Sequence, residues 1–226
     1  DPIGVPASVS DRASYIRIHF DRLNKDIVQG QAQLAKWDKR VLDNWHLLSR
    51  DLKIAFLADL AKKSPNSTNE LVANSLTSLA PSEGDPDVLA SILWVLSRVN
   101  IGPDRIVDTM QRIGVRDELD YMPLGYFGDQ DGTLRSYLQR TAQSLRSDYS
   151  RGTAYSAFLS QASRSMDRST IVGSVEQALL WHRMDGSSGA RERIISAVDN
   201  MAETYAPSAL QSLFATESDP NLRSDI

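Results

Sequence analysis

The stretch DPDVLASILWVLSRV, residues 85–99, decides the fold class. Asp85 and Pro86 are typical of a helix start, and the residues from Val88 to Val99 are apolar on nearly every side of a helix. Such a helix belongs at the centre of a core. No stretch of the sequence alternates apolar and polar residues with a period of two, so the sequence predicts an all-α protein.

Shorter helices are predicted on both sides of this core helix. Ser, Thr, Asp or Pro marks their starts, and Gly, Pro or clustered cations mark their ends. The expected ranges are 51–63, 67–79, 103–113, 133–149, 153–166, 170–184, 190–205 and 208–215. With the core helix they form a multi-helix bundle of about 8–9 shorter helices.

The N-terminal segment carries the most regular pattern. Apolar residues and one Gly recur every three or four positions up to Leu52, which is typical of the seam of a weakly supercoiled helix. We predict one long helix of about 40 residues, from about Asp11 to Arg50, that packs on the bundle or projects from it. Its candidate partner-contact residues are Ile16, Phe20, Leu23, Ile27, Gly30, Leu34, Trp37 and Val41.

The chain divides at one irregular segment. Residues 1–10 are an N-terminal extension, 11–114 hold the long helix and the first helical half, and 133–226 hold the second half. Residues 115–132 contain three Gly and one Pro, which predicts an irregular aromatic loop. This loop either separates two domains or lies within one continuous domain.

The aromatic loop also contains the second group of candidate partner contacts. Its apolar residues lack a helical period, so they either plug the core or anchor a partner. These residues are Tyr121, Met122, Leu124, Tyr126 and Phe127.

Composition excludes several classes of protein. Without Cys there is no disulfide, thiolate nucleophile or Cys-ligated metal. The apolar stretch Val88 to Leu96 has about half the roughly 20 residues that a membrane span needs, so we expect a soluble chain without one. A net charge of −4 disfavours nucleic acid as the main partner. A start at Asp1 rather than Met suggests a processed protein (exported, organellar or virion) and leaves the compartment open.

The motifs predict no catalytic residue, cofactor or metal site. His19, His46 and His182 are too scattered for a zinc site. Asp129 and Asp131 match two positions of a calcium loop. Two other ligand positions of that loop hold Phe and Leu, which favours a helix-capping turn.

Basic residues gather in the Ser-rich stretch from Thr133 to Ser169, which has six Arg against two Asp, with Tyr residues interleaved. This composition is typical of a phosphate-binding surface and also of solvated helix faces. The candidate anion contacts are Arg140, Arg146 and Arg151.

The sequence favours a non-catalytic structural or adaptor subunit of a larger multiprotein assembly, such as a particle or envelope complex. It would act through helix-mediated contacts with other protein subunits, either copies of itself or different chains. One alternative is an all-α enzyme with a site of dispersed acids, such as Glu118, Asp120 and Glu176, and a His. A second is an Arg-mediated phosphate or nucleic-acid binder.

Overall fold

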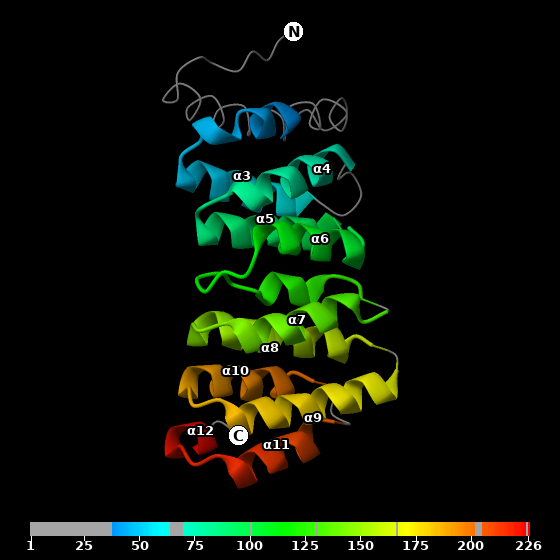
Figure 1. Ribbon diagram of the computed structural model, residues 1–226, viewed down its shortest axis with the longest axis vertical. Helices are drawn as coiled ribbons and strands as arrows, with labels where there is room; N and C mark the ends of the chain where they lie inside the picture. The colour runs from blue at the N-terminus through cyan, green and yellow to red at the C-terminus, as the bar shows by residue number, and fades with distance from the viewer. Residues whose placement is uncertain are drawn as a thin grey trace. The chain divides into compact units, whose positions relative to one another are not determined.

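The computed structural model describes residues 38–63, 70–99, 101–129, 131–165, 167–201, 205–224 and 226. Within these ranges the chain forms α-helices, short 3-10 helices and turns, with no β-strand, which confirms the all-α prediction (Figure 1). The α-helices are α3 (Arg50–Lys63), α4 (Glu70–Leu79), α5 (Pro86–Val99), α6 (Pro103–Ile113), α7 (Thr133–Ser144), α8 (Asp148–Ser163), α9 (Arg168–Met184), α10 (Ser188–Asp199), α11 (Ala206–Thr216) and α12 (Pro220–Ser224). The 3-10 helices are η2 (Trp45–Leu47), η3 (Ala80–Ser82) and η4 (Met122–Tyr126).

The predicted long helix is wrong at its C-terminal end. Residues 38–43 are helical, but the chain then turns through η2 and becomes extended at Leu48 before α3 begins at Arg50. The turn buries Trp45, whose indole N–H donates to Glu83 at 2.9 Å. The rest of the predicted helix, including the contact candidates from Ile16 to Trp37, lies outside the described residues.

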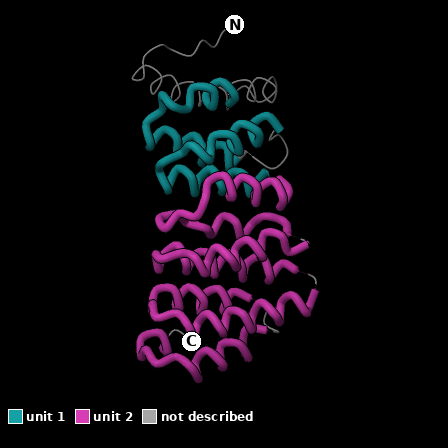
Figure 2. The backbone as a smooth tube through the Cα atoms, viewed as in Figure 1, with its two compact units in different colours: residues 1–99 teal, residues 100–226 magenta. Residues whose placement is uncertain are grey.

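The structure forms two compact units, one ending at Val99 and the other beginning at Asn100 (Figure 2). In the first unit, α5 packs against α3 and α4. Its side chains Leu89, Ile92 and Leu96 are fully buried, as expected of a core helix.

Glu83 links three segments of the first unit. Besides the Trp45 indole, its carboxylate accepts hydrogen bonds from Lys53 Nζ at 2.8 Å and from the Asp85 N–H at 3.1 Å. Burial alone would raise the pKa of Glu83, but these donors hold it below its ordinary value. The bonds therefore connect η2 and α3 to the start of α5.

In the second unit α8 is the central helix. It packs against η4, α7, α9 and α10, and most of its residues from Ser150 to Ala162 are buried. Small residues allow close approach on both sides, since a Cβ on Gly125 of η4 would lie 2.9 Å from Ser160 Cβ. A Cβ on Gly152 would lie 3.3 Å from the Ala190 Cα of α10.

Residues 115–132, where the sequence suggests a domain boundary, lie inside the second unit. They are irregular apart from η4, as their Gly and Pro content predicts. The backbone N–H of Tyr121 donates to Thr153 of α8 at 3.1 Å, and Gln161 of α8 donates to the Leu124 carbonyl at 2.5 Å. These bonds fasten the segment to the central helix.

The break between α7 and α8 differs from the predicted ranges 133–149 and 153–166. α7 ends at Ser144 and α8 begins at Asp148, because the Ser147 side chain caps α8 by accepting from the Ser150 N–H. No Gly or Pro marks this break in the sequence.

Candidate functional site

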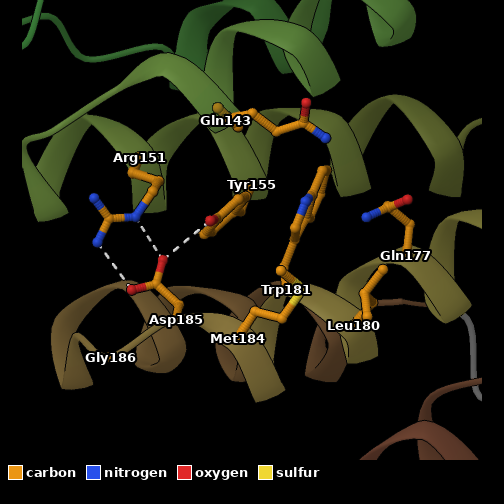
Figure 3. A pocket seen from close by; sticks show the side chains of 10 residues that line it. Gln143, Arg151, Tyr155, Gln177, Leu180, Trp181, Met184, Asp185 and Gly186 are labelled. Carbon is orange, nitrogen blue, oxygen red and sulfur yellow. Dashed lines mark hydrogen bonds and ion pairs between the residues drawn. The ribbon is translucent and has the colours of Figure 1, made fainter.

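A pocket of about 530 Å³ opens between α7 and α9 in the second unit (Figure 3). We call it the α7–α9 pocket. α7 contributes one wall, α8 the inner side, and α9 with the start of the next loop the other wall. Its lining residues are Ala142, Gln143, Arg151, Tyr155, Gln177, Leu180, Trp181, Met184, Asp185 and Gly186.

Two aromatic side chains form the floor of the pocket. The rings of Tyr155 and Trp181 stack with centroids 4.6 Å apart, and Phe158 meets the Trp181 ring edge-on at 4.9 Å. All three residues are at least nine-tenths buried. Stacked and edge-to-face ring pairs are favourable, so these contacts stabilise the floor in the form that the structure shows.

An ion pair closes one end of the pocket. The Arg151 guanidinium donates to both carboxylate oxygens of Asp185, at 2.5 and 2.8 Å. The Tyr155 hydroxyl donates to the same carboxylate at 3.0 Å, and the Ser187 N–H donates at 3.0 Å. Figure 3 shows these side chains from α8 converging on Asp185, whose side chain is only 4% exposed.

The surroundings of these groups shift the pKa of each one in the direction that stabilises its present protonation state. The hydrogen bond to Asp185 raises the pKa of Arg151. Burial raises the pKa of Tyr155, and the Asp185 charge adds to the effect. Burial would also raise the pKa of Asp185, but the hydrogen bonds from Arg151, Ser187 and Tyr155 together with the Arg151 charge outweigh it and lower that pKa. The Tyr155 phenol therefore stays protonated, and Arg151 and Asp185 stay a charge-balanced ion pair. None of the three groups is a free base.

The rim of the pocket is apolar on the α9 side. Met184 is 74% exposed and Leu180 is 43% exposed, although both are large apolar side chains. They lie one helical turn apart on α9 and flank the buried Trp181. An exposed apolar pair above an aromatic floor is typical of a contact site.

Side-chain amides provide the remaining polar groups. Gln139 of α7 donates to Gln177 of α9 at 3.0 Å. The Gln143 side chain is exposed and points toward the space beside the Trp181 ring (Figure 3). The pocket thus combines an apolar floor, neutral amides and a neutralised ion pair, which suits binding rather than acid–base chemistry.

Most of the aromatic-loop contact candidates are in the core. Tyr121, Leu124 and Phe127 are at most 1% exposed, so they pack the second unit. Burial raises the pKa of Tyr121 to about 12. Tyr126 is 39% exposed, and Arg164 lies over its ring at 4.7 Å. Met122 is half-buried.

Val41 and the three candidate anion contacts also divide into residues that are buried or paired and residues that are exposed. Val41 is buried in the first unit. Among the anion candidates, Arg151 is held by Asp185 and Asp148, which leaves its guanidinium no free edge for phosphate. Arg140 and Arg146 are exposed.

The two Asp of the calcium-like loop cap α7. Asp129 accepts from the backbone N–H groups of Leu134 and Arg135 at 3.1 and 2.9 Å, and Asp131 accepts from the Thr133 N–H. The helix-capping alternative therefore describes them. In the part of the chain that the structure describes, no three His, Asp or Glu side chains are placed to hold a metal ion.

A second cavity of about 690 Å³ lies beside this capping turn, between the end of η4 and the end of α8. Its acidic residues are already used as helix caps. Asp167 caps α9, and hydrogen bonds from Ser169 and Thr170 lower its pKa to about 2. We therefore treat the α7–α9 pocket as the candidate site.

His182 of α9 points into the protein. Its ring is 1% exposed, and Nε2 lies 3.0 Å from the Glu217 carboxylate, which also accepts from Arg191 of α10 at 2.9 Å. Its burial lowers the pKa of His182 more than the Glu217 charge raises it. His46 is exposed at η2, and His19 lies outside the described residues.

The acids proposed for an enzyme site lie on separate elements. Glu118 and Asp120 are in the segment before η4, and Glu176 is an exposed residue of α9. Asp120 accepts from the backbone N–H of Met122 at 2.9 Å, which stabilises the turn. The buried His182 instead pairs with Glu217.

The sequence does not reveal the pairing that builds the pocket. Arg151 and Asp185 are 34 positions apart, and no local pattern connects them. The sequence signal for the pocket is the position of two apolar residues, Leu180 and Met184, on the polar side of the helix that contains Trp181.

A scan against protein-family models and searches of curated proteins and solved structures find no match to this chain.

None of the helices in the described ranges has the length and apolar character needed to cross a membrane.

Proposed function

We propose that this chain is a non-catalytic helical subunit that acts through protein–protein contacts, with the α7–α9 pocket as a contact site. One observation carries the proposal: Met184 and Leu180 are exposed on α9 beside the aromatic floor. Binding energy at protein interfaces concentrates in a few residues, among which Trp and Tyr are enriched, and exposed apolar side chains beside them are typical of a contact site.

The electrostatics of the pocket support binding over catalysis. A general base needs an accessible group that gains and loses a proton near the working pH. Asp185 is instead held as a carboxylate by Arg151, and the Tyr155 phenol is held protonated. These groups organise the wall of the pocket.

The internal ion pairs weigh against phosphate binding at Arg151 and Arg135. Arg151 already has two carboxylate partners, and Arg135 faces the buried Asp129 carboxylate at 3.9 Å. A phosphate would have to displace these internal partners. Protein contact through apolar side chains needs no such exchange.

Native mass of the chain isolated gently from its source tests this proposal. Wild type should carry additional mass, either a different subunit or a second copy of itself. Met184→Glu should lose that mass, because it places a charge at the rim. Val172→Glu is the matched control, since Val172 is an exposed apolar residue of the same helix outside the pocket. A monomeric wild type, or equal behaviour of the two variants, would contradict the proposal.

A further inference from the structure

The charges of the α7–α9 pocket are already balanced. Asp185 accepts two hydrogen bonds from Arg151 and one from Tyr155, and the pair is largely shielded from water. A carboxylate or ammonium entering the pocket would lose its hydration and compete with this bidentate pair. The pocket therefore favours an uncharged group.

The polar groups of the pocket include donors that have no internal partner. Gln177 accepts from Gln139 through its oxygen, so its own N–H groups remain available. Within the described residues nothing accepts a hydrogen bond from the Trp181 indole N–H. Its nitrogen is not among the fully buried polar atoms without a partner. The Gln143 amide is at the surface. Amide and indole donors match the carbonyl groups of a peptide backbone.

The apolar part of the pocket suits a single large side chain and its flanking backbone. Its volume of about 530 Å³ lies within the about 300–1,000 Å³ range of small-ligand sites. Trp181 provides the floor, while Met184 and Leu180 flank the entrance. Met is adaptable and accommodates apolar partners of different shapes.

We propose that the α7–α9 pocket binds an uncharged apolar side chain on a peptide segment of the partner. Gln143, Gln177 and Trp181 donate to that segment's backbone carbonyls, and Met184 and Leu180 cover the side chain. The inference rests on the proposed protein-contact function and specifies the partner's chemistry at the same site.

Three phenylalanine derivatives with the same ring test the inference on the full chain. N-acetyl-phenylalanine amide is neutral, N-acetyl-phenylalanine is an anion, and phenylalanine amide is a cation. The readout is the NMR signal of the Met184 methyl group, assigned with Met184→Leu, and the buried Met201 methyl is the internal control. The neutral derivative should shift the Met184 signal saturably, with an affinity about tenfold above either charged one.

Two variants test the donor groups. Gln143→Ala and Gln177→Ala should each weaken binding of the neutral derivative by about fivefold, because each removes one hydrogen-bond donor while the aromatic floor stays intact. Gln211→Ala, at an exposed Gln of α11, should leave binding unchanged.

The outcomes separate the inference from the proposed function. Equal or tighter binding of a charged derivative would overturn the uncharged occupant, and so would the absence of any Met184 shift. Neither result would alter the native-mass comparison of Met184→Glu with Val172→Glu, which judges the contact function independently.

Discussion

The Asp185 carboxylate joins the end of α9 to the Arg151 guanidinium of α8 by two hydrogen bonds, of 2.5 and 2.8 Å. This pair closes one end of the α7–α9 pocket and orients the Tyr155 hydroxyl, whose ring supports Trp181. The shape of the pocket therefore depends on a contact outside its apolar part.

Removing Asp185 should destabilise the protein. Asp185→Ala leaves Arg151 largely buried without its main partner, which should lower the free energy of unfolding by about 3 kcal/mol. Urea denaturation measures this change. The control is Asp148→Ala, which removes the other carboxylate partner of Arg151. Asp148 is 62% exposed, so its loss should cost less than about 1 kcal/mol. An equal loss of unfolding free energy in the two variants would show that the Arg151–Asp185 pair contributes no more to stability than the exposed Arg151–Asp148 pair.

A methyl group on Gly125 should also be costly. Its Cβ would lie 2.9 Å from Ser160 Cβ and 3.1 Å from the Ala157 Cα of α8, so η4 must move away from α8. We expect Gly125→Ala to destabilise the protein by about 1–3 kcal/mol. Gly173→Ala, in α9, is the matched control, because a Cβ at this position would have no atom within 4 Å. This change should stabilise the protein by about 0.5–1 kcal/mol, since Ala favours a helix more than Gly does. Thermal unfolding of both variants tests the contrast, which a stable Gly125→Ala protein would refute.

Glu217 should hold the C-terminal helices in place. Its carboxylate accepts from Arg191 of α10 and from the Asp219 N–H before α12. Glu217→Ala removes both of these partners and the contact with His182, and we expect a loss of about 3 kcal/mol together with faster amide hydrogen exchange in α11 and α12. Glu192→Ala, at an exposed residue of α10, should change neither quantity. Unchanged exchange in the Glu217 variant would rule out this role.

Stability should fall on mild acidification because of His182. Burial lowers its pKa below the ordinary value of 6.5, despite the neighbouring Glu217 charge, and Arg191 adds to the lowering. The folded state therefore favours the neutral ring. The stability due to this preference is complete above about pH 6.5 and is lost as the pH falls through the lower pKa of the folded state.

Melting temperatures at pH 7.5 and 5.5 test this dependence. Wild type should lose more stability between the two values than His182→Gln, whose side chain does not titrate. The pKa of Glu217 is lowered from 4.5, so its own contribution is lost only at more acidic pH. A pH dependence that is identical in the two proteins would exclude His182 as its source.

The sequence is informative where helix boundaries are set locally. α5 begins at Pro86, and α6 ends at Ile113, just before Gly114, whose φ of 77° favours glycine. Both boundaries match the predicted ranges. The turn at Trp45 has no such marker. Trp45 occupies an apolar position that continues the helical pattern, so periodicity alone does not show that the helix ends before it. The end of the helix accompanies a hydrogen bond from Trp45 to Glu83, which lies 38 positions away.

The candidate site was less predictable than the fold. The Arg-rich composition pointed to Arg151, but its role depends on Asp185, which the chain brings near only after α8 and α9 have packed. The sequence also leaves open whether the aromatic loop is core or surface. Tertiary burial decides that question residue by residue, as Phe127 and Tyr126 show by being 1% and 39% exposed.

The most direct test of the contact function is a photo-crosslinker placed at position 184. Benzoyl-phenylalanine at this exposed rim position, introduced into the full chain in its source cells, should form one discrete product with a peptide segment of another subunit or a second copy. The same group at position 172 of α9 should not form that product. Crosslinking from position 184 only within its own chain, or equal products from both positions, would contradict a protein contact at the α7–α9 pocket.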